Sequence, residues 1–171
     1  MCEAPDRTPT ASDIETEQVV TRSVVNQLDA STREAIRDLV ARYNANGDSG
    51  RLTDVMALFV ADAVMEIDLG TGAEPERHEG LAAIEGVFRG AVVGDVAPTH
   101  VRHFTATQQI DLIDEVSATS RCYFQVLTQV GLDHWGRYVD RFVRTDEGWR
   151  FAQRRVTVDG YADDSLFRRP D

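Results

Sequence analysis

The chain has 171 residues, a length that suits one domain with a hydrophobic core of its own. Its hydrophobic content of 42% is ordinary for a globular protein, and no apolar run approaches the roughly 20 residues of a transmembrane helix. A formal net charge of −11 repels phosphate backbones and anionic membrane surfaces, so we expect neither nucleic acid nor membrane as a partner.

Motifs for cofactors and metals are missing from the sequence. The two cysteines, Cys2 and Cys122, do not make a disulfide framework or a zinc site. There is no phosphate-binding loop, dinucleotide fingerprint, His-Glu-x-x-His or Gly-x-Ser-x-Gly motif. Residues 1–13 are polar and lack the apolar centre of a signal peptide. We therefore expect a disordered leader, a cytoplasmic location, and no metal or cofactor.

Two helices are predicted in the first 50 residues. Valines at loosely helical spacing predict the first over Ile14–Leu28. Ser31 followed by Glu34 is typical of a capping box, which begins the second helix. The apolar face of this second helix is made by Ile36, Leu39, Val40 and Tyr43. Gly47 and the polar residues around it are expected to end it.

The next segments alternate between helix and strand patterns. A third helix is predicted over Leu52–Val60, a short strand over Ala63–Leu69 and a polar loop over Gly70–Glu79. A further amphipathic helix is marked by the apolar residues Leu81, Ile84, Val87 and Phe88. These segments place most helices before the β-rich part of the chain.

The second half of the chain is rich in β-forming residues. Four strands are predicted, separated by turn-like residues. They are His100–Leu112, Ser117–Val130, Trp135–Arg144 and Trp149–Val158. Helices followed by an antiparallel meander indicate an α+β domain with the helices on one face of the sheet. We expect this single domain to span residues 14–160, with residues 161–171 as a polar tail.

Three local patterns occur in the order and at the distances found in one known group of proteins. The first is the hexapeptide Tyr43–Asp48, followed eleven residues after its end by Phe59. The others are His103–Thr107, at the start of a strand, and Gly136–Asp140 with Gly-Trp-Arg-Phe and Arg154 downstream. In these patterns the chain resembles the SnoaL-like branch of the nuclear transport factor 2-like superfamily. Several relatives have asparagine at the position of Thr107.

The resemblance implies a fold and a range of functions. The fold is a curved antiparallel sheet forming a cone, with N-terminal helices packed on it and an internal pocket. Relatives include scytalone dehydratase, a dehydrochlorinase, bile-acid dehydratase, polyketide cyclases and ketosteroid isomerase, whereas dioxygenase β subunits are not catalytic. Homo-oligomers, either dimers or trimers, are usual. Since one fold serves many activities, function has to be argued from the site.

His103 and Asp48 are the central candidates for catalysis. In dehydratase-like relatives, residues at these positions form a dyad. Histidine titrates near neutral pH and can take and return a proton, and a carboxylate on its other ring nitrogen fixes the tautomer. The alternatives are that Asp48 caps the following helix and that His103 is a hydrogen-bonded core residue. His100 is expected on the opposite strand face, and His78 and His134 on the surface.

The remaining candidates would bind the substrate. Tyr43 could donate its hydroxyl to a substrate carbonyl, or could be a core tyrosine. Arg154 either lines the pocket, with Asp140 as the partner that a buried arginine needs, or is exposed. The resemblance implies three further pocket residues, which are Thr105, Tyr123 and Phe59.

Three functional hypotheses follow. The first is a cofactor-independent dehydratase, cyclase or isomerase that abstracts a proton from a small apolar polyketide-, steroid- or terpenoid-like substrate. The second is a non-catalytic small-molecule-binding or assembly module. The third is an epoxide hydrolase, in which Asp48, Arg154 and Asp140 would surround a water. A short distance between Asp48 and His103, with both facing one cavity, would favour the first hypothesis.

Overall fold

The computed structural model describes residues 11–90 and 98–168, with side chains described from Leu28 onward. Most of the expected leader (residues 1–10) and the end of the expected tail (residues 169–171) lie outside the described residues. The chain divides into two units, residues 1–34 and 35–171. Among the described residues, the second unit contains every strand and all of the cavity that is described below.

The helices are α1 (Ala11–Asp48), α2 (Leu52–Met56) and α3 (Leu81–Gly90). The prediction of two helices separated near Ser31 is wrong, because α1 runs through this position. The hydroxyl of Ser31 donates to the carbonyl of Leu28 at 2.9 Å, the back-bond of a residue inside a helix rather than a cap. Residues 11–13, expected in the leader, also belong to α1. No described helix has the length and apolar character needed to cross a membrane.

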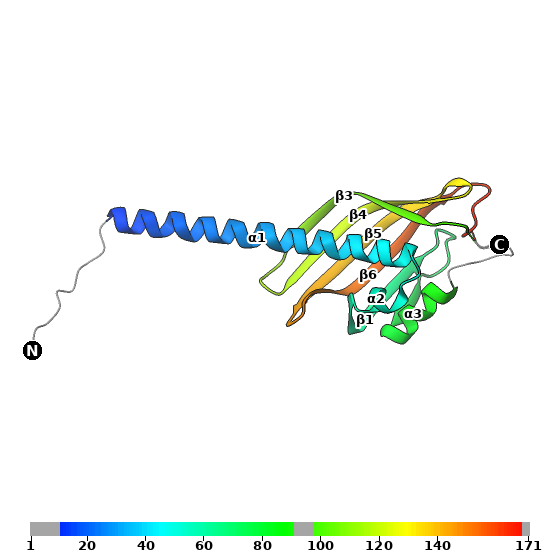
Figure 1. Cartoon of the computed structure of the whole chain (residues 1–171), viewed down its shortest axis with the longest axis horizontal. Helices are drawn as coiled ribbons and strands as arrows, with labels where there is room; N and C mark the ends of the chain where they lie inside the picture. The colour runs from blue at the N-terminus through cyan, green and yellow to red at the C-terminus, as the bar shows by residue number, and fades with distance from the viewer. Residues whose placement is uncertain (1–10, 91–97, 169–171) are drawn as a thin grey trace, which may run out of the picture. The chain divides into compact units, whose positions relative to one another are not determined.

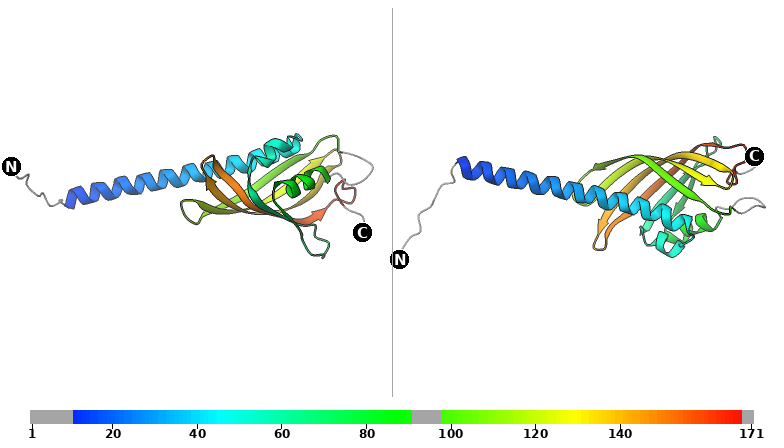
Figure 2. Two further views of the ribbon diagram at one scale, coloured as in Figure 1. Left: turned by 90° about the horizontal axis from the view of Figure 1, so that it is seen from below. Right: turned by 45° about the horizontal axis from the view of Figure 1, so that its top comes forward.

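In the described part of the chain, six strands form one sheet in the order β2-β1-β6-β5-β4-β3. They are β1 (Phe59–Asp68), β2 (Glu76–Glu79), β3 (Arg102–Leu112), β4 (Ser117–Thr128), β5 (Gly131–Thr145) and β6 (Gly148–Tyr161). The predicted meander from β3 to β6 is confirmed, and only the pairing of β1 with β6 is parallel. Figures 1 and 2 show that these strands twist and curve as one open sheet.

Several boundaries differ from the predictions. Helix α2 ends at Met56 because Phe59 already pairs with β6, opposite Phe151. The predicted loop over Gly70–Glu79 contains β2, whose polar residues do not show the pattern of a strand. An ion pair across β1 and β2, Arg77 to Glu66 at 2.6 Å, joins the two strands on their exposed side.

The core lies between the sheet and residues 35–48 of α1, together with α2 and α3. Its buried members include Ile36, Val55, Ile84, Phe142 and Phe151. Five further residues form a second buried cluster, which are Cys122, Phe124, Val126, Tyr138 and Val158. The apolar stripe predicted for α1 is therefore confirmed as a core face.

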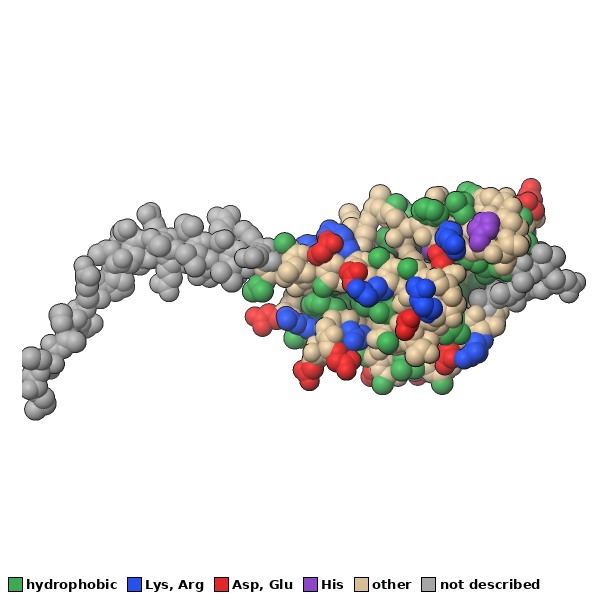
Figure 3. Space-filling view, in the orientation of Figure 1, with side chains coloured by type: hydrophobic (Ala, Val, Ile, Leu, Met, Phe, Trp, Pro, Cys, Tyr) green, Lys and Arg blue, Asp and Glu red, His purple; other side chains and the backbone are tan. Residues whose placement is uncertain are grey.

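The surface carries both signs of charge. The side chains of Asp38 and Arg42 form an ion pair of 2.6 Å one turn apart on α1. Acidic and basic side chains are interspersed over the face drawn in Figure 3. Exposed pairs of this kind are screened by water and contribute little to the free energy of unfolding. Burial of the apolar face of the sheet contributes more.

Candidate active site

A cavity of about 660 Å³ lies within the second unit. Most of its wall is apolar and comes from α1, α3, β1, β4 and β6. The polar groups that face it include Asn44, Asp48, His78, His103 and His134. An apolar cavity with a few convergent polar groups is the usual form of a small-molecule site.

Asp48 and His103 meet at the wall of this cavity. Nδ1 of His103 lies 2.5 Å from Oδ1 of Asp48, and the backbone N–H of His103 donates to Oδ2 at 2.9 Å. The side chain of Asp48 is 9% exposed and that of His103 is 25% exposed. The last residue of α1 is thus tied to the beginning of β3 by two bonds.

The alternative roles considered for these two residues do not fit the geometry. The residue that precedes α2 at its N-cap is Arg51, and no side chain caps this helix. Asp48 uses both carboxylate oxygens on His103 instead. His103 is partly exposed to the cavity and is not a fully buried core residue.

The contact with Asp48 determines which ring nitrogen of His103 carries the hydrogen. A carboxylate accepts hydrogen bonds, so Nδ1 carries the hydrogen that it donates to Asp48. Among the described residues, Nε2 has no hydrogen-bond partner. The neutral ring therefore has a free lone pair on Nε2, as a general base requires.

Tyr43 and Asn44 follow each other on α1, and both line the cavity. Tyr43 is buried, and burial raises the pKa of its hydroxyl while the nearby charge of Arg154 opposes this effect. The hydroxyl therefore stays protonated at neutral pH and can donate a hydrogen bond. Asn44 is only 7% exposed, and its Oδ1 is buried with no hydrogen-bond partner among the described residues.

Arg154 is not part of the cavity lining, but its guanidinium packs against Tyr43 and Tyr138, which are. It forms a buried ion pair with Asp140, as the sequence predicted for a buried arginine. The other three expected substrate-binding residues are also absent from the cavity wall. Phe59 is packed in the core, whereas Thr105 and Tyr123 are exposed on the sheet.

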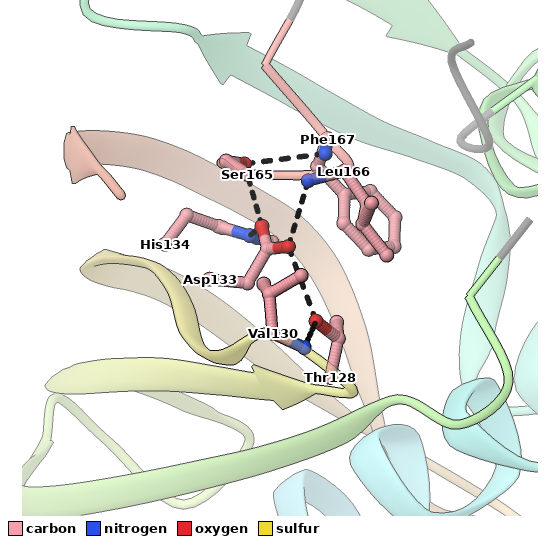
Figure 4. Close-up of polar contacts among 7 residues, drawn as sticks. All are labelled: Thr128, Val130, Asp133, His134, Ser165, Leu166 and Phe167. Atoms are coloured by element: carbon pink, nitrogen blue, oxygen red, sulfur yellow. Dashed lines mark hydrogen bonds and ion pairs between the residues drawn. The ribbon is translucent and has the colours of Figure 1, made fainter. Parts of the chain in front are cut away.

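Two histidines expected on the surface face the cavity instead. His78 lies on β2, and its side chain is 26% exposed, with Nε2 3.5 Å from a carboxylate oxygen of Glu76. His134 lies on β5, and its side chain is 12% exposed. Its Nδ1 lies 2.8 Å from Oδ1 of the fully buried Asp133 (Figure 4). The expected turn at residues 131–133 is the beginning of β5, which places His134 in the sheet.

The sequence contains one indication of this second pair, which is that Asp133 and His134 are adjacent. Adjacent side chains of a strand point to opposite faces, so adjacency alone does not predict contact. The contact arises at an irregular strand end, where the pairing of β4 and β5 shifts register after Val126. Asn44 gave no separate signal, since it lies inside the first resemblance pattern. Within residues 28–90 and 98–168, no cluster of His, Cys, Asp or Glu could hold a metal ion.

Comparison with known proteins gives the relatives of this chain. The profile of the SnoaL-like domain matches residues 29–155. No curated protein sequence matches the chain. A protein from Novosphingobium aromaticivorans, proposed to be a scytalone dehydratase, superposes with a TM-score of 0.68 at 18% identity and covers 85% of this chain and 99% of its own.

Two further solved structures show the breadth of the likeness. LinA superposes with a TM-score of 0.66 at 14% identity, covering 85% of this chain and 99% of its own. The β subunit of a proposed aromatic-ring-hydroxylating dioxygenase from Novosphingobium aromaticivorans has a TM-score of 0.64 at 19% identity, covering 84% and 98%. At these identities the likeness is one of fold.

The profile match covers α2, α3, five complete strands and the residues of both histidine–aspartate pairs. The curved six-stranded sheet with helices on one face agrees with it. The chain therefore belongs to the SnoaL-like domain family and has the nuclear transport factor 2-like fold.

Proposed function

We propose that this protein is a cofactor-independent enzyme of the dehydratase, isomerase or cyclase type, with His103 as its general base. The observation that supports this proposal most directly is the pair of His103 and Asp48 at the wall of a largely apolar cavity. The relatives of the same fold include a protein proposed to be a scytalone dehydratase. The substrate would be a small, mostly apolar molecule with an acidic C–H bond.

In the proposed reaction, Nε2 of His103 takes a proton from the carbon next to a substrate carbonyl. The electron pair of the broken C–H bond forms an enolate, and Asp48 stabilises the imidazolium. Tyr43 donates a hydrogen bond to the enolate oxygen. In a dehydration, the enolate then expels a β-hydroxyl group, which leaves as water with the proton returned by His103. In an isomerisation, the proton returns to another carbon.

Two other mechanisms have less support. The chain contains no lysine, so a Schiff base with a lysine side chain is not available to it. An epoxide hydrolase would need Asp48, Arg154 and Asp140 around one water. Asp48 is engaged with His103, and the buried pair of Arg154 and Asp140 is not part of the cavity wall.

The likeness to a dioxygenase β subunit supports a second candidate, a non-catalytic binding or assembly module. The two candidates differ in what His103 does. For a binding module, the base would be dispensable and replacement of His103 would leave ligand binding unchanged.

The test is turnover of hydroxy-ketone, steroid and polyketide compounds, followed by product mass. His103→Ala and Asp48→Asn are compared with wild type, and His100→Ala is the matched control because His100 is exposed three residues away. We expect loss of most of the rate in the first two variants and wild-type rate in the control. Equal turnover in all four proteins would refute the mechanism. Binding without turnover, equal in all four, would favour the binding module.

A further inference from the structure

Asp133 and His134 form a second histidine–aspartate pair at the cavity. The carboxylate of Asp133 is fully buried and accepts hydrogen bonds from the hydroxyl of Ser165 at 2.7 Å and the backbone N–H of Leu166 at 2.9 Å. The hydroxyl of Thr128 adds a longer bond of 3.3 Å. Figure 4 shows these groups converging on Asp133 from β4, β5 and the segment after β6. The carboxylate is thus fixed from three directions.

This arrangement determines the state of the His134 ring. Burial opposes the charge of Asp133, but the hydrogen bonds from Ser165, Leu166 and His134 keep the pKa of Asp133 below its usual value. An ionised Asp133 only accepts, so Nδ1 of His134 is the donor. Burial lowers the pKa of His134, and Asp133 opposes this effect without cancelling it. The ring is therefore neutral at pH 7, with its lone pair on Nε2.

The lone pair of His134 has no partner within the described parts of the chain. Only Nδ1 of this ring makes a hydrogen bond, and His134 lines the cavity. An acceptor that faces a largely apolar cavity favours a ligand that supplies a donor to it. Asn44, on the α1 side of the cavity, has a buried side-chain oxygen with no hydrogen-bond partner among the described residues.

The sheet places the two histidines in one row. His103 of β3 pairs with Val126 of β4, and Val126 pairs with His134 of β5. Directly paired residues share a face, and neighbouring strands are about 4.8 Å apart, so the Cα atoms of the two histidines are about 10 Å apart. Both rings lie beside Phe124, at centroid distances of 6.5 and 6.0 Å.

We propose that His134 is a specificity-determining residue that accepts a hydrogen bond from a hydroxyl group of the substrate. The substrate class is then a flat, hydroxylated ring compound, an alcohol, enol or phenol, whose hydroxyl group lies at the end remote from the C–H bond that His103 attacks. Phe124, Tyr161 and Phe167, which line the cavity around His134, provide flat surfaces for such a ring. The inference rests on the proposed function for the role of His103 only.

A purely structural role for His134 is the competing explanation, since its ring packs 5.1 Å from that of Phe167 and 5.8 Å from that of Tyr161. The variant His134→Phe keeps an aromatic ring for this packing and removes the acceptor. The probes are 2-naphthol, which has a hydroxyl donor, and 2-methoxynaphthalene, which does not. Calorimetric titration of the full chain measures binding of both probes without any turnover.

We expect His134→Phe to weaken binding of 2-naphthol by about tenfold, the usual effect of one lost hydrogen bond to a ligand. Binding of 2-methoxynaphthalene should be the same in both proteins. The nitrogen resonance of Nε2 in His134 should shift when 2-naphthol is added to wild type. Equal affinity of 2-naphthol for both proteins, an unchanged Nε2 resonance, or no binding of 2-naphthol to wild type would each overturn the proposal.

The binding experiment also separates this inference from the proposed function. His103→Ala removes the proposed base and leaves His134 in place. Suppose that 2-naphthol binds more weakly to His134→Phe than to wild type, but that His103→Ala retains turnover. The proposed function then fails and the role of His134 stands. The reverse pattern removes the role of His134 only.

Discussion

The guanidinium of Arg154 and the carboxylate of Asp140 form two parallel hydrogen bonds of 2.8 Å, and neither side chain is exposed. The rings of Tyr43, Tyr138 and Phe151 enclose the guanidinium at 4.0 to 4.4 Å from their centroids. Burial alone would lower the pKa of Arg154, but the charge and hydrogen bonds of Asp140 more than offset it and raise the pKa. The guanidinium of this pair packs against the ring of Tyr43, which lines the cavity.

Removing one partner of this pair should be far more destabilising than replacing both. Asp140→Ala leaves a buried, uncompensated guanidinium, and we expect a loss of about 3–5 kcal/mol in the free energy of unfolding. The double variant Asp140→Leu with Arg154→Met should lose much less, because no charge stays buried. Urea unfolding measures both, and a cost for Asp140→Ala no larger than that of the double variant would contradict this account.

Asp48→Asn should reduce turnover through the tautomer of His103. The asparagine oxygen can still accept the backbone N–H of His103, which turns the amide NH₂ toward Nδ1. Nδ1 then becomes the acceptor and Nε2 carries the hydrogen, so the base is blocked. On any compound that wild type converts, we expect kcat to fall by about 10²- to 10⁴-fold with little change in KM. A larger effect on KM than on kcat would indicate a role in binding instead.

The stability of the protein should fall as the pH drops below about 6.5, partly because of His134. Burial lowers the pKa of this ring from its usual 6.5, so below that pH the unfolded chain takes up a proton that the folded chain does not. One such proton changes the stability by at most about 1.4 kcal/mol per pH unit. The charged or titratable groups near His134 are Asp133, Tyr161 and His103.

The comparison with His134→Phe isolates this contribution. We expect the decrease in unfolding free energy between pH 7 and pH 5 to be smaller in the variant, since the variant lacks the ring whose pKa is lowered on folding. Chemical unfolding at a series of pH values measures it. Parallel pH profiles for the two proteins would show that the folded state does not disfavour protonation of His134.

Gly136 should not tolerate a side chain. A Cβ at this position would lie 2.0 Å from the carbonyl oxygen of Thr157 and 2.9 Å from the ring of Phe124. We expect Gly136→Ala to cost about 3 kcal/mol, because backbone atoms cannot move aside cheaply. Gly86→Ala on α3 is the control, since its Cβ would meet nothing within 4 Å and alanine favours a helix by about 0.5–1 kcal/mol. Thermal unfolding that ranks the two variants in the opposite order would contradict the prediction.

Thr107 should be a site where a substitution raises the stability of the protein. It has a φ of 54°, in the left-handed region that β-branched residues avoid, at the bulge where the pairing of β3 with β4 shifts. Asparagine tolerates this region, so Thr107→Asn should raise the free energy of unfolding by about 0.5–1 kcal/mol. Thr105→Asn, on the same strand before the bulge, is the control and should not stabilise. Equal effects of both changes in urea unfolding would show that backbone strain at Thr107 is negligible.

Much of the fold could be predicted from the chain because its patterns are local. The apolar stripe of α1 and the four strands of the meander are read from spacing, and the structure confirms them. Strand β2 could not be predicted, because its four polar residues are extended only through pairing with β1. The helix break near Ser31 was wrong because a cap-like pair of residues also fits inside a helix.

The candidate site could also be predicted only in part. The proximity of Asp48 and His103 was expected from a resemblance in spacing, and the geometry agrees. His134 was expected on the surface, since neither the register shift beside it nor the later segment that anchors Asp133 has a local signature. Arg154 shows a further limit, because the sequence left open whether this side chain lines the pocket or is exposed. In the structure it does neither and is buried against the ring of Tyr43.

The anchoring of Asp133 by Ser165 and Leu166 has a practical consequence for work on this protein. Phe167, two residues after Ser165, lines the cavity. A truncation before Ser165 would remove both donors to Asp133 together with Phe167, and would disturb the wall around His134 while leaving the sheet intact. Shortened variants made for ligand screening should therefore keep the segment through Phe167.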